Sequence, residues 1–299
     1  MRNVDAILVA DIHIRESQPE CRLDNFMETQ ERKHQWLKKL QSKYDCPILC
    51  AGDLFDYWKP SPWLLGWTFR NLANGIIAVP GQHDLPAHNL ENITKSGIQV
   101  LSDGDKIKLI TNPDNDYHTI KDYEVLGFPW GFDWNIDCDA KEKIALIHYG
   151  VYESKPHYPG AENTGGTAKS VMKKLPGYDL IVSGDNHLTF IQSLGSQLLV
   201  NPGSFTRQTA AQADHKPCVF LWDSKSNEVE KVYVPIEQNV ISREHIEKVK
   251  ERDERLESFI SKLDNNVELS ISFKNNLRNH IAVNNVDKDV IKIIWECVP

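Results

Sequence analysis

The sequence lacks a run of about 18 consecutive apolar residues, the length that a transmembrane helix needs, so we expect no membrane span. Its six cysteines are scattered and form no C-x-x-C pair, which is typical of free thiols in a reducing compartment. The apolar stretch before Asp11 is too short for a signal peptide and contains an acidic residue. These absences favour a cytoplasmic protein.

Positive charge is also scarce, because 34 Lys and Arg stand against 42 Asp and Glu and the formal net charge is −8. This balance excludes a protein that coats nucleic acid by bulk electrostatic attraction, but not one that binds a phosphate through a metal ion. The sequence contains neither a G-x-S-x-G nucleophile motif nor a G-x-x-x-x-G-K-[ST] phosphate-binding loop. Serine-nucleophile chemistry is therefore not expected, and any ATPase activity would belong to a separate chain.

The 299 residues, 40% hydrophobic and 25% charged, have the composition of an ordinary globular protein. Short apolar and β-branched runs predict strands over residues 4–10, 47–51, 76–80, 107–110, 123–128, 143–147, 180–183, 197–200, 218–222 and 230–234. Helices are predicted over 24–43 and 63–74, the second capped by Ser61. This order predicts an α/β fold with a largely parallel first half and a more antiparallel second half.

The composition changes after Pro235, where charge becomes dense. Apolar residues at helical spacing predict an amphipathic helix over 242–262, followed by a strand over 267–273 and helices over 275–281 and 288–297. We therefore divide the chain into a domain of residues 1–236 and a small α+β appendage of residues 237–299. Packing of the long helix on its own domain is favoured over pairing with a partner.

Five segments far apart in the sequence place Asp, His or amide side chains just after a predicted strand. They are Asp11-Ile12-His13, Gly52-Asp53-Leu54-Phe55-Asp56, Gly81-Gln82-His83-Asp84, His148-Tyr149-Gly150 and Gly184-Asp185-Asn186-His187. In open α/β sheets ligands bind in the crevice beyond the carboxyl ends of the strands, so these segments should converge. Carboxylates and imidazoles gathered there without Lys or Arg would repel one another, whereas divalent cations would turn them into ligands.

As a set, the segments resemble the D-x-H, G-D-x-x-D, G-N-H-[DE], lone His and G-H-x-H motifs of the calcineurin-like metallophosphoesterase superfamily, in the right order over roughly residues 5–205. The resemblance implies a sandwich of two mixed β-sheets flanked by helices. It also implies two divalent metal ions with a hydroxide between them that attacks the phosphorus. The implied ligands are Asp11, His13 and His187 for the first metal, the bridging Asp53, and Gln82, His148 and Asp185 for the second.

Two further residues are catalytic in the implied mechanism. His83 would contact the phosphate and stabilise charge in the transition state or protonate the leaving oxygen. Asp84 would orient His83 by accepting a hydrogen bond from its other ring nitrogen.

Gln82 and Asp185 depart from the family pattern, which usually has Asn and His at these positions. The second site would then offer three oxygen ligands and one nitrogen. Oxygen ligands favour manganese, with magnesium as a second possibility, over zinc. The alternative is that the second site is impaired.

The Gly52-to-Asp56 segment and the Pro202-Gly203-Ser204 turn look most like the SbcD-type branch of double-strand-break repair exonucleases. This likeness implies a two-metal phosphodiesterase acting on DNA, with a possible SbcC-type ATPase subunit and a possible homodimer. One alternative is a phosphodiesterase or phosphatase for a small (cyclic) nucleotide. A second is a weakly active scaffold that binds partners through its charged helix.

Further substrate contacts are expected from Lys155, Lys169 and Arg207, which would bind DNA phosphates weakly and in a salt-sensitive way. Four aromatic residues follow the bridging carboxylate closely in the sequence, and packing in the core and at its rim is favoured for them over stacking on nucleobases. They are Tyr57, Trp58, Trp63 and Trp67.

Overall fold

The computed structural model describes residues 3–113, 116–132, 142–155, 165–244, 246, 252–256, 273–284 and 286–298. By packing, the chain divides into two compact units, Met1–Ser242 and Arg243–Pro299. The last residues of the first unit pack against its amino-terminal part: Ile241 forms a β-bridge with Arg22, and the Val240 carbonyl accepts a hydrogen bond from Leu23 N.

The first sheet has four parallel strands at one side and an antiparallel hairpin at the other. Its spatial order is β14 (Glu228–Tyr233), β13 (Cys218–Asp223), β1 (Ala6–Val9), β2 (Ile48–Cys50), β3 (Ile76–Ala78) and β4 (Ile107–Leu109).

The second sheet has a parallel centre with one antiparallel strand at each edge. Its order is β11 (Phe190–Leu194), β12 (Gln197–Asn201), β10 (Tyr178–Gly184), β7 (Lys143–His148), β6 (Tyr123–Phe128) and β5 (Tyr117–Ile120). The expectation of a more antiparallel second half is confirmed, because β11–β12, β13–β14 and β1–β13 pair antiparallel, although β7–β10 and β10–β12 pair parallel. The connection between β7 and β10 contains a helix, which gives it the length that a parallel crossover requires.

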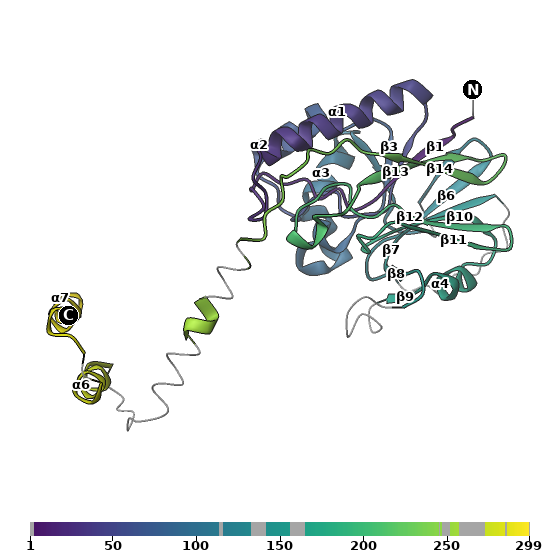
Figure 1. The fold of residues 1–299 in the computed structure, drawn as a ribbon. Helices are drawn as coiled ribbons and strands as arrows, with labels where there is room; N and C mark the ends of the chain where they lie inside the picture. The colour runs from purple at the N-terminus through teal and green to yellow at the C-terminus, as the bar shows by residue number, and fades with distance from the viewer. Residues whose placement is uncertain are drawn as a thin grey trace. The chain divides into compact units, whose positions relative to one another are not determined.

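Helices cover the outer face of each sheet, as Figure 1 shows. On the first sheet lie α1 (Phe26–Tyr44), α2 (Pro62–Asn71) and α3 (Gly97–Asp103), and on the second lies α4 (Ala168–Lys174). Alternate residues of β1 face opposite ways: Ile7 and Val9 pack under the helices, whereas Ala6 and Leu8 pack between the sheets. The expected α/β sandwich of two mixed sheets flanked by helices is confirmed.

All ten predicted strands of the first unit are present, as are the two predicted helices. Ser61 caps α2 by accepting a hydrogen bond from Leu64 N at 3.1 Å. Prediction missed α3, α4, the edge strands β5 and β11, and the short pair β8 (Gly150–Tyr152) and β9 (Gly165–Thr167). Edge strands expose polar side chains, and glycine-rich strands carry little apolar signal, so neither shows a strand pattern.

Short 3-10 helices occupy Gln82–Asp84, Pro86–His88, Leu90–Lys95 and Ala210–Gln212. In the second unit, α6 (Phe273–Val283) and α7 (Lys288–Cys297) agree with the predicted helices. The predicted strand 267–273 lies outside the described residues except for Phe273, which begins α6. Of the predicted helix 242–262, the described stretch 252–256 is helical.

Within the described ranges, no helix combines the length and apolarity needed to cross a bilayer. Five cysteines are free thiols there, and Cys138 lies outside the described residues.

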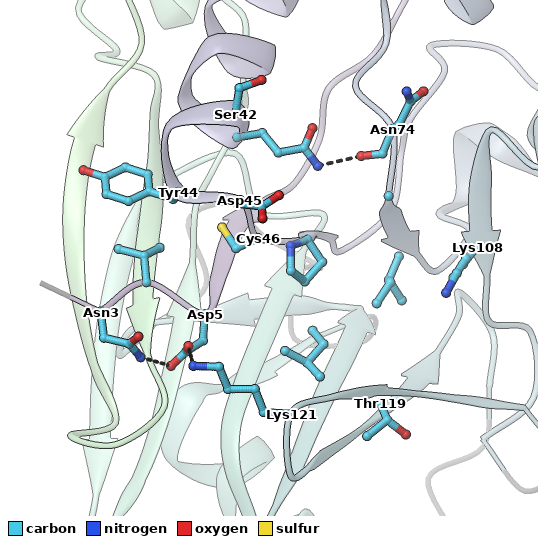
Figure 2. A pocket seen from close by; sticks show the side chains of 16 residues that line it. Asn3, Asp5, Ser42, Tyr44, Asp45, Cys46, Asn74, Lys108, Thr119 and Lys121 are labelled. Carbon is cyan, nitrogen blue, oxygen red and sulfur yellow. Dashed lines mark hydrogen bonds and ion pairs between the residues drawn. The ribbon is translucent and has the colours of Figure 1, made fainter.

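Asp5, just before β1, joins three parts of the first unit. Its carboxylate accepts hydrogen bonds from Ser224 N (2.8 Å) and Oγ (2.6 Å) in the β13–β14 turn and pairs with Lys121 in the β5–β6 turn. Figure 2 shows this ion pair in the wall of a pocket of about 840 Å³ at the amino ends of β1, β2 and β3. Because Lys121 belongs to the second sheet, the pair ties the two sheets together at that end.

Replacing Asp5 by Asn should destabilise the protein at neutral pH by about 1 kcal/mol, a small value because Lys121 is half exposed. Burial opposes the ionisation of Asp5, but its bonds to Lys121 and Ser224 lower its pKa to about 2. The carboxylate therefore stabilises the fold above a pH of about 4, and this contribution is lost as the pH falls through about 2. Urea unfolding at pH values of about 7, 4 and 2.5 measures the difference, which should shrink at the lowest pH.

Candidate metal centre

The candidate ligands all lie at the carboxyl ends of parallel strands from both sheets. Asp11 and His13 follow β1, Asp53 follows β2 and Gln82 follows β3; His148 ends β7, and Asp185 and His187 follow β10. Four of these residues have a left-handed backbone: φ is 47° at Asp11, 50° at His13, 50° at Asp53 and 77° at Asp185. Such conformations are uncommon for residues with a Cβ and cost energy, so backbone strain is concentrated at this edge.

The side chains after β1, β2 and β10 converge closely. His13 Nε2 lies 3.2 Å from His187 Nε2 and 3.7 Å from Asp53 Oδ2. Asp53 Oδ2 lies 3.4 Å from His148 Nε2. Donor atoms form three overlapping groups, each within 4.8 Å: Asp11 with His13 and His187, Asp11 with Asp53 and His148, and Asp53 with His13 and His83.

Gln82 and Asp185 join the same cluster. Gln82 Nε2 donates to Asp185 Oδ1 at 2.6 Å, and Asp185 N donates to Asp11 Oδ1 at 3.0 Å. The amide oxygen of Gln82 is left free for another partner. The structure therefore brings all seven sequence-predicted ligands into one connected group.

Divalent cations fit this group, because several of its buried acceptor atoms have no hydrogen-bond partner among the described residues. Buried polar atoms are nearly always hydrogen-bonded, so such a concentration at one point is exceptional. Oxygen and imidazole nitrogen are also the donor types that divalent metals prefer. The atoms are Asp11 Oδ2, His13 Nδ1, Asp53 Oδ2, Gln82 Oε1 and His148 Nε2.

The protonation preferences of the group point the same way. Burial raises the pKa of the Asp11 carboxyl to about 8. Burial alone would lower the pKa of His148, but the Asp53 carboxylate beside it raises that pKa to about 10. Burial lowers the pKa of His13 to about 3, so its imidazole is neutral and able to bind a metal. Without a cation the group therefore favours protons on Asp11 and His148, and divalent cations would supply that positive charge in their place.

Two main-chain carbonyls orient the imidazoles. His148 Nδ1 lies 2.6 Å from the Ala51 oxygen, so it carries the proton and leaves Nε2 directed at Asp53. His83 Nδ1 likewise lies 2.8 Å from the Asp56 oxygen. The His83 ring is exposed and packs edge-on against His13, with centroids 4.9 Å apart. This is the position of a side chain that can reach a bound substrate.

The expected hydrogen bond from His83 to Asp84 is wrong. Asp84 is fully buried, and its carboxylate accepts hydrogen bonds from Leu54 N (3.1 Å), Phe55 N (2.9 Å) and Gly81 N (3.0 Å). With its oxygens turned to these amides, Asp84 fastens the segment after β2 to the segment after β3. His83 takes the Asp56 carbonyl as its partner instead.

Of the residues expected to contact the substrate, some are buried and some are exposed. Arg207 is buried and donates to the Ala213 and Glu237 oxygens, so it cannot contact DNA. Lys155 and Lys169 are exposed. Of the aromatic group, Trp67 packs in the core as favoured, whereas Tyr57 and Trp63 are 59% and 55% exposed.

Sequence reasoning missed Arg15 and Gln208, because neither belongs to a motif. Arg15 Nη1 pairs with Asp56 Oδ2 at 3.0 Å, and Asp56 Oδ1 lies 3.7 Å from His13 Nδ1. Gln208 Nε2 donates to the His13 oxygen at 2.9 Å. One signal could have pointed to Arg15: it continues the every-second-residue spacing of Asp11 and His13.

Two mixed sheets with this donor set at their common carboxyl edge define a metal-dependent phosphoesterase. The chain belongs to the calcineurin-like phosphoesterase superfamily, whose domain matches residues 5–226. No curated protein matches the chain by sequence.

Several solved structures are similar in fold, all at low identity. An archaeal phosphodiesterase is 13% identical over 76% of this chain and 98% of its own, with a TM-score of 0.41. A candidate 5′-nucleotidase from Staphylococcus aureus is 13% identical over 84% of this chain and 58% of its own, with a TM-score of 0.46. A phosphopantetheinyl hydrolase from Mycobacterium tuberculosis is 13% identical over 79% and 98%, with a TM-score of 0.45. None of these likenesses assigns a substrate to this chain.

Replacing Gly81 by Ala should weaken Mn²⁺ binding by about 10-fold or more, because the added Cβ would press on the carboxylate and main-chain N of Asp53. Titration calorimetry with Mn²⁺ measures the change. Gly66→Ala is the matched control: it lies in α2, meets only the flexible end of Arg70 at 3.3 Å, and should leave binding unchanged. Full affinity in Gly81→Ala would remove Asp53 from the metal centre.

Proposed function

We propose that this protein is a two-metal phosphodiesterase that cleaves DNA, in the manner of the SbcD-type exonucleases of DNA repair. The observation that carries the phosphodiesterase assignment is the cluster of seven candidate ligands, four buried and three half-buried, with the exposed His83 beside it. Asp11, His13 and His187 would hold one ion, Gln82, His148 and Asp185 the other, and Asp53 both. When bound, the two ions would neutralise the phosphate oxygens and activate the attacking water.

The side chains of the site have distinct tasks in this proposal. In its doubly protonated form His83 donates a hydrogen bond or proton from Nε2 to the phosphate or the leaving oxygen, while its Nδ1–H stays bonded to the Asp56 carbonyl. Its main-chain N donates to Asp53 Oδ1 at 2.9 Å, which keeps the ring in register with the bridging carboxylate. Asp84 supports this geometry by holding the Gly81 amide and so the loop that carries His83.

Manganese is the proposed metal of the second site, with magnesium next. Gln82 and Asp185 give that site amide and carboxylate oxygens where the family pattern has Asn and His, and their mutual hydrogen bond at 2.6 Å places both side chains at the cluster. Oxygen-rich sites favour these harder cations.

DNA is proposed as the substrate because of the SbcD-like sequence segments. Tyr57 and Trp63, which follow Asp53 closely in the sequence, are exposed and offer rings for unpaired bases. A small nucleotide is the alternative, favoured by the burial of Arg207 and by the pairing of Arg15 with Asp56, which leave few cations at the rim. An SbcC-type ATPase or a second copy of the chain is the proposed partner of the second unit. Exposed apolar residues on α6 and α7, such as Phe273 and Ile293, support that role.

Replacing His83 by Ala should leave Mn²⁺ affinity within about threefold of wild type while lowering kcat by about 10²- to 10⁴-fold, because the residue acts on the transition state. Hydrolysis of bis-p-nitrophenyl phosphate beside calorimetric Mn²⁺ binding separates the two effects. If the His83→Ala variant instead bound less Mn²⁺ but kept full activity per bound ion, His83 would act as a metal ligand and not on the transition state.

The substrate proposal is tested with wild type in Mn²⁺, on labelled single- and double-stranded DNA and on cyclic mononucleotides, at low and moderate salt. DNA cleavage that weakens with salt is expected, because each neutralised phosphate steepens the salt dependence of binding. Turnover of cyclic mononucleotides with no DNA cleavage at any salt would replace the nuclease proposal by its alternative. Chelator should abolish every activity.

Replacing Asp185 by His should shift the metal preference toward zinc and cobalt, because imidazole nitrogen suits these softer ions better than carboxylate oxygen does. Hydrolysis rates with Mn²⁺, Zn²⁺ and Co²⁺ are compared between variant and wild type. An identical profile would show that Asp185 is not a ligand.

A further inference from the structure

One stretch of main chain, residues 204–213 between β12 and β13 (the 204–213 segment), is held by three buried cations. Lys33 Nζ on α1 donates to the Phe205 oxygen at 3.2 Å, and Arg22 Nη1 donates to the Arg207 oxygen at 3.2 Å. Arg207 itself donates from Nη1 to the Ala213 oxygen at 3.0 Å. The three cations are between 3% and 6% exposed.

The other side of the same segment holds the candidate ligands of the first metal. Ser204 N donates to the His187 oxygen and Phe205 N to the Asp11 oxygen, each at 3.1 Å. The side-chain amide of Gln208 donates to the His13 oxygen at 2.9 Å. The segment therefore touches all three residues of one donor group, and it does so at their main chains, two of which are left-handed.

The amide of Gln212 adds a side-chain contact. Its Oε1 accepts from Gln208 N at 2.6 Å and from Thr209 N at 3.1 Å, which turns its Nε2 toward His187 Nδ1 at 3.4 Å. Gln212 thus folds the segment onto itself. The donors that the segment directs at the candidate metal centre come from Ser204, Phe205, Gln208 and Gln212.

The cations are costly for the fold. Only Arg22 has a carboxylate partner, Asp24, at 2.5 Å. Within the described ranges no carboxylate lies within ion-pair distance of Lys33, and Arg207 Nε has no hydrogen-bond partner. A buried charge without a partner destabilises a protein, and an apolar side chain of the same size is often tolerated better. Their depth also keeps all three from touching a substrate or a partner.

Lys33 shows the cost most clearly. Burial, followed by the charges of Arg22 and Arg207, lowers its pKa to about 7. The remaining charged or titratable groups that face it are Asp24, Glu237, His34 and His215. The fold disfavours this ammonium, yet the ammonium lies where it donates a hydrogen bond to the Phe205 carbonyl. The main-chain N of the same Phe205 donates to the Asp11 oxygen.

We propose that Lys33 is a positioning residue of the metal centre: with Arg22 and Arg207 it clamps the 204–213 segment in the conformation that presents Asp11, His13 and His187 to a divalent cation. This inference rests on the proposed metal centre. The clamp acts on the main chain of the ligands, so its loss relaxes their strained backbone and disperses their donor atoms.

The clamp is tested with Lys33→Met, which keeps the length of the side chain and removes its charge. Mn²⁺ affinity should fall roughly 3- to 10-fold by titration calorimetry, because a residue behind the ligands is removed. The Tm of the same variant in chelator should equal or exceed that of wild type, because a buried unpaired charge is gone. Lys39→Met, an exposed lysine of the same helix, is the control and should change neither quantity.

The pH profile gives a second readout, which measures the cost of the buried ammonium to the fold. Below a pH of about 7 the folded protein carries the buried ammonium at full cost. Between about 7 and 10 the folded lysine is neutral while the unfolded lysine is still charged, so wild type gains stability as the pH rises. The Tm advantage of Lys33→Met in chelator should therefore shrink over this range.

Gln208→Met checks the other side of the segment, since it removes the donor to the His13 oxygen without touching the cations. It should weaken Mn²⁺ binding about 10-fold. Unchanged Mn²⁺ affinity in both variants overturns the proposal, and so does a fall of Tm in Lys33→Met, which would mean that the ammonium serves the fold.

The proposed function fails separately from this inference. Absence of Mn²⁺ binding in wild type removes the metal centre itself. Mn²⁺ binding in wild type without phosphodiester hydrolysis rejects the activity while leaving the clamp testable by affinity.

Discussion

The fold is arranged around one group of buried acceptor atoms in the candidate metal centre, for which the described part of the chain offers no hydrogen-bond donor. Asp11, Asp53 and His148 meet in the interior at the edge of two sheets, where one buried polar atom of each has no hydrogen-bond partner among the described residues. Such a group is stable only when positive charge is supplied, and divalent cations supply it with the least movement of the protein. The strained backbone after β1 and β2 is the cost of pointing these atoms at one place.

The scaffold around this group is made of main-chain contacts. Carbonyls of Ala51 and Asp56 fix the rings of His148 and His83, and Asp84 uses its carboxylate on three backbone amides. Small residues make the close approach possible, since a Cβ at Gly81 would collide with Asp53. Backbone groups hold a site more rigidly than long side chains do, because they have no rotamers to lose.

The sequence predicted most of the strands of the two sheets, but it did not predict which strands pair with each other. Ten apolar runs became strands, because a strand buried on both faces must be apolar throughout. The parallel pairing of β7 with β10 was not predicted, since it depends on a crossover through α4, whose short sequence carries no strong helical signal. Edge strands such as β5 were missed for their exposed, polar character.

The sequence by itself determined the α/β class and the strand ends, because strand periodicity is a local property of a chain, and the resemblance of its motifs to a known superfamily indicated the seven residues gathered there. Tertiary structure alone decided that Asp84 serves the backbone, that Arg207 is buried, and that Lys33 reaches the segment behind Asp11. These contacts join residues up to 172 positions apart. No local pattern encodes such a pairing, since it exists only once the sheets and α1 have packed.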